Sequence, residues 1–263
     1  MTNLSHITCF LLDMDGTVYL GDKLLPGALE FLQQAKQAGS DLLFLTNNSS
    51  RSTAYYAEKL TRMGWPASPQ DILTSGMATA AYIHSLQPKA RVYLVGTQEL
   101  ADEFSTWGLI LTSDAPDFVV LGFDTTLTYH KLQTACQLIT DGVCYIATHP
   151  DINCPTETGY IPDCGAMIAL IQASTGRLPK VIGKPNKEII EAAFSRKPYS
   201  TRQMAMIGDR LYTDMATAKN AGITGILVLS GETKQEHLAE SPIEPDYVFD
   251  NLGELAYRLR QTE

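Results

Sequence analysis

The chain has 263 residues, enough for one large or two modest domains at about 150 residues each. With 20 Lys and Arg against 29 Asp and Glu, the net charge of −9 disfavours a nucleic-acid partner, because no basic cluster offsets it. A hydrophobic content of 44% excludes a disordered chain, and the longest apolar runs are too short to span a bilayer. No Lys or Arg precedes Lys23, so the N-terminus lacks the basic flank of a secretory signal. We therefore expect a cytoplasmic protein that binds neither nucleic acid nor membrane.

The first hundred residues alternate short apolar runs with helical periodicity. Residues 7–12 form an apolar run that predicts a buried strand ending on Asp13. Pro26 opens a predicted helix that Gly39 caps, and residues 42–45 predict the next strand. This strand-helix-strand order is typical of an α/β fold with a parallel sheet.

The same pattern returns near the C-terminus and surrounds a block that carries its own strands and helices. The C-terminal strands are predicted at residues 203–207, 223–229 and 247–249, with a helix at 213–221. The central block has predicted strands at 92–95, 118–121 and 145–147 and a helix at 127–140. We therefore predict a core of residues 1–78 and 180–263 with an inserted α/β domain of residues 79–179. Turn chemistry places the hinges at residues 74–76 and 177–179.

Cysteine usage indicates a reducing compartment. The five cysteines are an odd number with no C-x-x-C pair, and their spacings match no usual zinc pattern. We expect unbridged, mostly buried thiols at Cys9, Cys136, Cys144, Cys154 and Cys164.

The strongest chemical signal is the string Asp13-Met14-Asp15-Gly16-Thr17 at the end of an apolar strand. Two carboxylates at a strand end are not a core feature, because unpaired buried charges are costly. The structural alternative is an Asp-rich turn that Gly16 completes.

Three later segments place polar groups where predicted strands end. They are Thr46-Asn47, Gly183-Lys184-Pro185, and Gly208-Asp209 followed by Asp214. Each has an ordinary explanation by itself: a hydroxyl turn, a solvated lysine, or an aspartate that caps a helix. Together they line the sheet edge at which open parallel sheets bind ligands.

Converging carboxylates require a cation, because two of them about 4 Å apart repel by about 4 kcal/mol at an effective dielectric of about 20. Oxygen ligands from Asp13, Asp15 and Asp209 indicate Mg²⁺. Thr46 and Lys184 then supply donors to a phosphoryl group. Asp13 can attack phosphorus, and Asp15 can protonate the leaving alkoxide and later deprotonate water.

The four ordered motifs resemble those of the haloacid dehalogenase (HAD) superfamily. More narrowly, the segments at residues 45–51, 74–80, 155–157 and 182–185 resemble the NagD-like, or 4-nitrophenylphosphatase-like, branch. The resemblance covers nearly the whole chain. It implies a doubly wound, Rossmann-like core with a C2-type α/β cap inserted between the second and third motifs.

The resemblance also implies a role for each motif residue. Asp13 becomes the nucleophile and a metal ligand, Asp15 the acid/base and a ligand through its carbonyl, and Asp209 the third protein ligand. Asp214 orients metal-bound water or Lys184. Thr46 and Asn47 bind the transferred phosphoryl, and Lys184 neutralises its charge.

In this branch the cap loops select the leaving group. Residues 148–151 and 163–165 are the candidate loops, with His149 and Asp151 as candidate substrate contacts; both could equally be turn residues. Asp163 adds a negative charge where relatives have small neutral residues, which predicts that a second anionic group on the substrate is disfavoured.

We predict a Mg²⁺-dependent phosphatase that hydrolyses small phosphomonoesters such as sugar phosphates, nucleoside monophosphates and 4-nitrophenyl phosphate through an aspartyl phosphate. One alternative is a phosphotransferase or mutase using the same intermediate. A receiver-like signalling domain fits less well, because it needs neither Asp15 nor a hundred-residue insertion, and the intact motifs argue against an inactive binding protein. The partner is a small phosphorylated metabolite. Its identity and the oligomeric state stay open, although a cap-to-cap homodimer would suit the branch.

Overall fold

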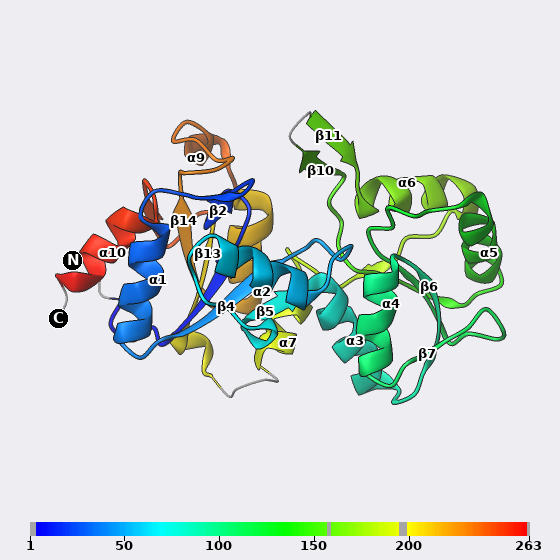
Figure 1. Ribbon diagram of the computed structural model, residues 1–263. Coiled ribbons are helices and arrows are strands. Elements are labelled where there is room, and N and C mark those ends of the chain that lie inside the picture. Colours follow the sequence, from blue (N-terminus) through cyan, green and yellow to red (C-terminus); the bar gives the residue numbers. More distant parts are fainter. Residues whose placement is uncertain (1–3, 157–158, 195–198, 262–263) are drawn as a thin grey trace. The chain divides into compact units, whose positions relative to one another are not determined.

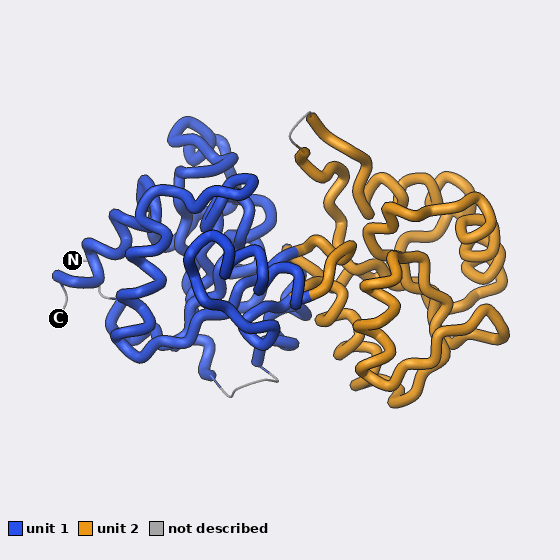
Figure 2. Tube along the Cα trace, in the orientation of Figure 1, with its two compact units in different colours: residues 1–46, 53–73, 185–263 blue, residues 47–52, 74–184 orange. Residues whose placement is uncertain are grey.

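The computed structural model describes residues 4–156, 159–194 and 199–261. The chain divides into two compact units, which are treated separately below (Figure 2). Unit 1 contains residues 1–46, 53–73 and 185–263, and unit 2 contains residues 47–52 and 74–184. These bounds differ from the predicted ones: the N-terminal crossing falls at residue 74, the C-terminal crossing at residue 185, and a short excursion at 47–52 joins unit 2.

Unit 1 is built on a six-stranded sheet with the order β15-β14-β13-β1-β4-β5 (Figure 1). The strands are β1 (Cys9–Asp13), β4 (Asp41–Thr46), β5 (Ile72–Thr74), β13 (Met204–Gly208), β14 (Thr224–Val228) and β15 (Tyr247–Phe249). A short hairpin of β2 (Tyr19–Leu20) and β3 (Lys23–Leu24) follows β1. β1 pairs in parallel with both β13 and β4, and the pairs β13–β14 and β14–β15 are also parallel.

The strand order reverses at β1. The chain proceeds from β1 to β4 and β5 on one side, and later to β13, β14 and β15 on the other. In an open α/β sheet such a reversal leaves a crevice at the carboxyl ends of the strands, where ligands bind. The predicted class, an α/β fold with a doubly wound parallel-sheet core, is confirmed.

Helices bury the apolar faces of this sheet. The helices of unit 1 are α1 (Ala28–Gln37), α2 (Thr53–Arg62), α7 (Glu188–Phe194), α8 (Ala216–Ala221), α9 (His237–Glu240) and α10 (Leu252–Arg260). Single 3₁₀ turns lie at Pro69–Asp71 and Thr201–Gln203. In the core, Phe10 of β1 meets Phe31 of α1 edge to face, with ring centroids 5.3 Å apart. α1 also packs against α10.

The helix predicted at residues 213–221 is two elements. A wide π-helical turn, Leu211–Met215, precedes α8. The Asp214 carboxylate accepts a hydrogen bond from the Arg210 backbone N–H at 3.1 Å, which ties the start of this turn to its own side chain. Such π turns are frequent at functional sites.

Unit 2 has its own five-stranded sheet with the order β12-β9-β8-β6-β7, in which all the pairs are parallel. Its strands are β6 (Arg91–Val95), β7 (Ile110–Leu111), β8 (Phe118–Leu121), β9 (Cys144–Ala147) and β12 (Lys180–Val181), with an antiparallel hairpin of β10 (Asn153–Thr156) and β11 (Gly159–Pro162). Its helices are α3 (Ser75–Leu86), α4 (Gln98–Thr106), α5 (Tyr129–Thr140) and α6 (Cys164–Thr175). β8 is buried along its whole length, as its continuous apolar sequence requires.

Two composition-based expectations can be compared with the structure. None of the described helices combines the length and apolar character needed to cross a bilayer. The cysteines form no disulfide in the described chain, as predicted, but the expectation of mostly buried thiols is wrong. Only Cys9 and Cys164 are buried, because Cys144 lies at the exposed start of β9 and the other two are half-buried.

Candidate active site

The core motifs of unit 1 meet at the carboxyl edge of its sheet. Asp13 is the last residue of β1 and is in register with Leu45 of β4, so Thr46 lies one residue beyond it on the neighbouring strand. On the other side of β1, β13 ends at Gly208 and Asp209 follows. The parallel register therefore brings Asp13, Thr46 and Asp209 to the switch point of the sheet.

Three carboxylates converge there. One oxygen each of Asp13, Asp209 and Asp214 lies within 4.8 Å of the others. Asp209 and Asp214 are buried, whereas Asp13 is half-buried. The Thr17 hydroxyl donates to Asp13 Oδ2 at 3.3 Å, and the Glu232 backbone N–H donates to Asp209 Oδ2 at 2.7 Å. These bonds fix the orientation of the carboxylates.

The electrostatics of this cluster call for a cation. Burial, followed by the neighbouring charges of Asp13 and Asp214, raises the pKa of Asp209 to about 7; the Glu232 N–H and the Arg210 guanidinium offset only part of the effect. The available donors are all carboxylate oxygens, which suit a hard divalent ion with open positions. The residues present therefore fit the divalent metal expected from the sequence.

Glycines make room for the Asp209 carboxylate on two sides. Gly16 has a φ of +90°, and a Cβ there would lie 2.8 Å from Asp209 Cγ. A Cβ at Gly231 would lie 2.7 Å from Asp209 Cβ. Both distances are shorter than the 3.4–4 Å of ordinary contact. Gly16 is thus required both for its positive φ and for the space that Asp209 fills.

Asp15 lies in a different environment. Its residue is exposed, but partial desolvation by the surrounding chain is the largest cause of a pKa raised to about 6. Lys59 lowers this pKa, Asp13 raises it, and Arg210 and a hydrogen bond from Tyr19 lower it. The Lys59 ammonium lies over the buried Tyr19 ring, 4.1 Å from its centroid. Asp15 can therefore hold a proton at mildly acidic pH.

Sequence reasoning missed the groups that surround Asp15. Arg210 follows Asp209 directly, and this adjacency was the only available signal for it. Tyr19 and Lys59 gave no signal, because one reads as a strand residue and the other as a solvated position of an amphipathic helix.

Asn47 and Lys184 belong to unit 2, where they bind each other. Asn47 Oδ1 accepts from the Lys184 N–H at 2.8 Å, and Asn47 Nδ2 donates to the Lys184 carbonyl at 3.0 Å. The same amide nitrogen lies 3.2 Å from both carboxylate oxygens of Asp151. These two hydrogen bonds between Asn47 and Lys184 join two motifs that are 137 residues apart in the chain.

His149 and Asp151 lie with Asp163 in a second cluster, also within unit 2. The His149 side chain is fully buried, with Nδ1 at 3.7 Å from Asp151 Oδ2 and Nε2 at 3.5 Å from Asp163 Oδ1. Asp163 precedes α6, and its Oδ1 accepts from the Cys164 N–H at 2.6 Å. The two residues expected to contact substrate thus pack against a second carboxylate, that of Asp163.

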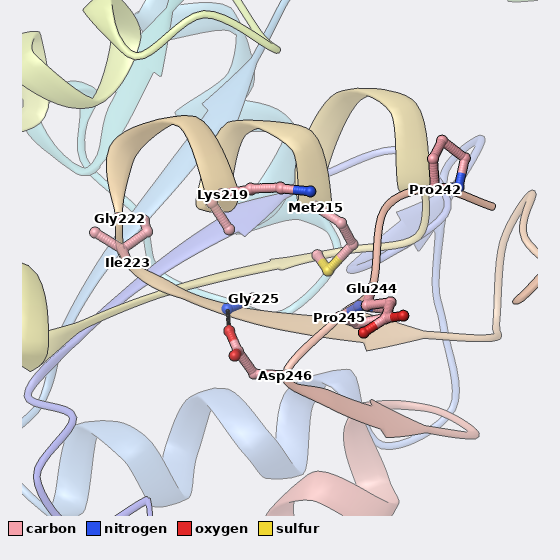
Figure 3. A pocket seen from close by; sticks show the side chains of 10 residues that line it. Met215, Lys219, Gly222, Ile223, Gly225, Pro242, Glu244, Pro245 and Asp246 are labelled. Atoms are coloured by element: carbon pink, nitrogen blue, oxygen red, sulfur yellow. Dashed lines mark hydrogen bonds between the residues drawn. The ribbon is translucent and has the colours of Figure 1, made fainter.

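A separate pocket of unit 1, of about 490 Å³, contains none of these motif residues (Figure 3). It lies beside α8 and the first residues of β14, which is the amino end of that strand. Its Asp246 carboxylate accepts from the Gly225 N–H at 2.7 Å, so this side chain has a structural role. The carboxylate cluster at the opposite ends of the strands is therefore the better candidate for catalysis.

Comparisons with known proteins agree with this geometry. A family model described as "Haloacid dehalogenase-like hydrolase" matches residues 10–110, and a second HAD-type model matches residues 181–255. The chain is 36% identical over 245 residues to the 5'-nucleotidase YutF of Bacillus subtilis, covering 93% of this chain and 96% of the relative.

Solved structures give the same result. A 4-nitrophenylphosphatase from Thermotoga maritima superposes with a TM-score of 0.93 at 49% identity, over 97% of this chain and 98% of the other. A glycerol phosphate phosphatase from Mycobacterium tuberculosis, in complex with magnesium, gives a TM-score of 0.90 at 34% identity, over 97% of this chain and 78% of the other. The chain therefore belongs to the haloacid dehalogenase-like hydrolases, in the branch of the NagD and 4-nitrophenylphosphatase proteins.

Proposed function

We propose that the protein is a Mg²⁺-dependent phosphatase that hydrolyses small phosphomonoesters through an aspartyl phosphate on Asp13. The observation that carries the proposal is the convergence of Asp13, Asp209 and Asp214 at the sheet switch point of a phosphatase-family chain. Relatives named as 4-nitrophenylphosphatase, acid sugar phosphatase and 5'-nucleotidase support hydrolysis of a monoester rather than transfer to a second hydroxyl.

The metal ligands in this proposal are the Asp13 and Asp209 carboxylates and the Asp15 backbone carbonyl. Asp214, which the Arg210 backbone N–H orients, is not one of these ligands. When bound, Mg²⁺ supplies positive charge that neutralises these carboxylates and the phosphoryl oxygens.

Asp13 and Asp15 divide the chemistry between them. An Asp13 oxygen attacks phosphorus, the bond from phosphorus to the ester oxygen breaks, and Asp15 gives its proton to the departing alkoxide. Asp15, now a carboxylate, takes a proton from water as the water oxygen attacks the phosphoryl group. Inorganic phosphate leaves and Asp13 is regenerated. The raised pKa of Asp15, about 6, suits a group that must both give and take a proton.

Thr46, Asn47 and Lys184 are the proposed phosphoryl-binding groups. The side-chain amide of Asn47 is already engaged, since its oxygen accepts from the Lys184 N–H and its nitrogen donates to the Lys184 carbonyl and to Asp151. We therefore assign phosphoryl binding by Asn47 to its backbone N–H. Lys184 provides a positive charge for the transferred group.

His149 and Asp151 remain the proposed leaving-group determinants, with unequal roles. The Asp151 side chain is 19% exposed, whereas that of His149 has no exposed surface. Asp151 is therefore the proposed contact with the leaving group, and His149 packs beside it with Nδ1 at 3.7 Å from Asp151 Oδ2. The nearby Asp163 carboxylate disfavours a substrate with a second anionic group.

The central test is direct detection of the intermediate. The protein is mixed with 4-nitrophenyl phosphate and Mg²⁺, quenched in acid during turnover, digested and analysed by mass spectrometry. We expect a phosphate adduct on the peptide that contains Asp13, and loss of turnover with EDTA. An unmodified Asp13 peptide during active turnover would contradict the mechanism.

Substrate preference is tested separately with a panel of phosphorylated metabolites. Comparing a sugar monophosphate with the bisphosphate in the wild type and in Asp163→Asn isolates the proposed charge effect. We expect the variant to lower the ratio of monophosphate turnover to bisphosphate turnover, whereas an unchanged ratio would show that Asp163 does not act on the substrate.

A further inference from the structure

The side-chain cluster of His149, Asp151 and Asp163 in unit 2 has the chemistry of a metal site that is separate from the carboxylates of unit 1. One ligand atom from each of the three residues lies within 4.8 Å of the other two. The imidazole adds a nitrogen donor, which the carboxylate cluster of unit 1 lacks. The two clusters therefore differ in the kind of cation that they would select.

The imidazole is the independent sign that this cluster takes a ligand. His149 is completely buried, and neither of its ring nitrogens has a hydrogen-bond partner in the described chain. Buried ring nitrogens normally have a hydrogen-bond partner, since a buried polar atom without one is destabilising. Both nitrogens instead face a carboxylate, at separations too long for a hydrogen bond.

A shared cation requires the three ligand atoms to draw closer together, mainly by movement of Asp151. Ligands bound to one tetrahedral ion at about 2.0–2.1 Å lie about 3.3 Å from one another. From His149 Nε2, the Asp163 oxygen at 3.5 Å needs to move by only a few tenths of an ångström. The Asp151 oxygen lies 3.7 Å from the other ring nitrogen, Nδ1, so it has to move further, although the three ligand atoms already lie within 4.8 Å of one another. The metal would take one ring nitrogen and one oxygen from each carboxylate.

Both carboxylates are already oriented by groups outside the cluster. Asp151 accepts from the Asn47 amide at 3.2 Å, and Asp163 accepts from the Cys164 N–H at 2.6 Å. Such outer contacts are typical of metal sites, where they fix the ligands. Burial raises the pKa of Asp163, and His149 and the Cys164 N–H offset this only in part, so a bound cation would stabilise its charged form.

The cluster also has an entrance. The exposed fraction is 19% for the Asp151 side chain, 5% for Asp163 and 0% for His149. A cation can therefore reach Asp151 first and move inward to the other two ligands.

We propose that His149, Asp151 and Asp163 bind a divalent transition-metal ion of the Zn²⁺ type, which fastens the loop before β10 to the start of α6. A nitrogen donor with two carboxylates favours Zn²⁺ over Mg²⁺, which prefers oxygen ligands alone. The proposal does not depend on phosphatase activity.

The test uses Zn²⁺ as the probe on the full-length protein in saturating Mg²⁺, so that the all-oxygen cluster of unit 1 is occupied. Calorimetry measures the affinity, and nitrogen NMR of ¹⁵N-histidine-labelled protein reports whether a ring nitrogen binds the metal. We expect one equivalent of Zn²⁺ to shift one ring nitrogen of His149. His149→Asn and Asp163→Asn should each weaken this binding by at least about tenfold.

His130→Ala is the matched control, because His130 is an exposed histidine of α5 in the same unit. It should bind Zn²⁺ as the wild type does. If His149→Asn does not fold, Asp163→Asn decides, because asparagine keeps the size of the side chain and an acceptor for the Cys164 N–H. Zn²⁺ binding that is equal in wild type and variants, or no shift at His149, would overturn the proposal while leaving the Asp13 mechanism intact.

Discussion

Substitution of Gly16 by alanine tests whether the space beside Asp209 is part of the active site. Alanine at the observed φ of +90° costs about 1–2 kcal/mol of stability. The new Cβ would lie 2.8 Å from Asp209 Cγ and closer still to Asp209 Oδ2, so contact at 3.4 Å requires a shift of at least 3.4 − 2.8 = 0.6 Å. Gly231 encloses the same carboxylate from another direction, which limits where Asp209 can move.

Gly21→Ala is the matched control for the backbone cost. Gly21 lies between β2 and β3 with a φ of +58°, and nothing lies within 4 Å of its would-be Cβ. We expect Gly21→Ala to lose about 1 kcal/mol of unfolding free energy in urea and to keep its activity. Gly16→Ala should lose about 2–3 kcal/mol, from the same backbone cost plus overpacking.

Activity separates the two variants more sharply than stability does. Since a misplacement of about 1 Å can cost about 10²-fold in rate, the Asp209 shift in Gly16→Ala should lower kcat/KM by about 10–100-fold and weaken Mg²⁺ activation. Steady-state rates with 4-nitrophenyl phosphate across a Mg²⁺ titration measure both effects. If Gly16→Ala matched Gly21→Ala in kcat/KM and in Mg²⁺ dependence, the argument that Asp209 is held in a functional position would be refuted.

Other outcomes follow from the carboxylates and from the buried ion pair of unit 2. Asp13→Asn should abolish turnover while circular dichroism and substrate binding stay unchanged; retained activity would mean that another group is the nucleophile. Because Asp15 must be protonated to act as an acid, kcat/KM for an alkyl phosphate should fall by up to about tenfold per pH unit above its pKa of about 6, and much less for 4-nitrophenyl phosphate; equal profiles would contradict this role. Lys131→Met removes the ammonium that lies 2.7 Å from the buried Asp124 carboxylate and should lower the free energy of unfolding in urea by about 2–4 kcal/mol. Arg62→Met breaks only an exposed ion pair and should lower it by less than about 0.5 kcal/mol. Similar losses in the two variants would show that burial does not set the cost of breaking an ion pair.

The α/β class and the position of the core motifs could be predicted because both depend on local patterns. An apolar run such as residues 9–12 indicates a strand buried on both faces, and the polar residue that ends it must lie at the sheet edge. The order of those motifs along the chain does not by itself give the strand neighbours, since β1 lies between β4 and the much later β13. The unit boundaries were predicted less closely, because the turn signals at residues 177–179 do not report where tertiary contacts change.

The contacts made by the motif side chains could not be predicted. Asn47 and Lys184 bond across 137 residues of sequence, and no local pattern encodes this pairing. The same holds for His149 and Asp163, whose proximity depends on the register of β9, the path of the β10–β11 hairpin and the start of α6. Sequence spacing identified the chemical groups, whereas their partners required the folded backbone.

Burial is the largest cause of the raised pKa of both Asp15 and Asp209, but the two carboxyl groups differ in exposure and in the charges around them, and this difference bears on their proposed roles. Asp209 is 2% exposed, and after burial its largest perturbations come from two carboxylates of the same charge, which a bound cation would neutralise. Asp15 is exposed, and its neighbouring cations, Lys59 and Arg210, lower its pKa. A group that exchanges protons with water and substrate needs such access, whereas a metal ligand needs enclosure. The exposure of Asp15 and the burial of Asp209 therefore support the proposed roles, proton transfer for Asp15 and metal binding for Asp209.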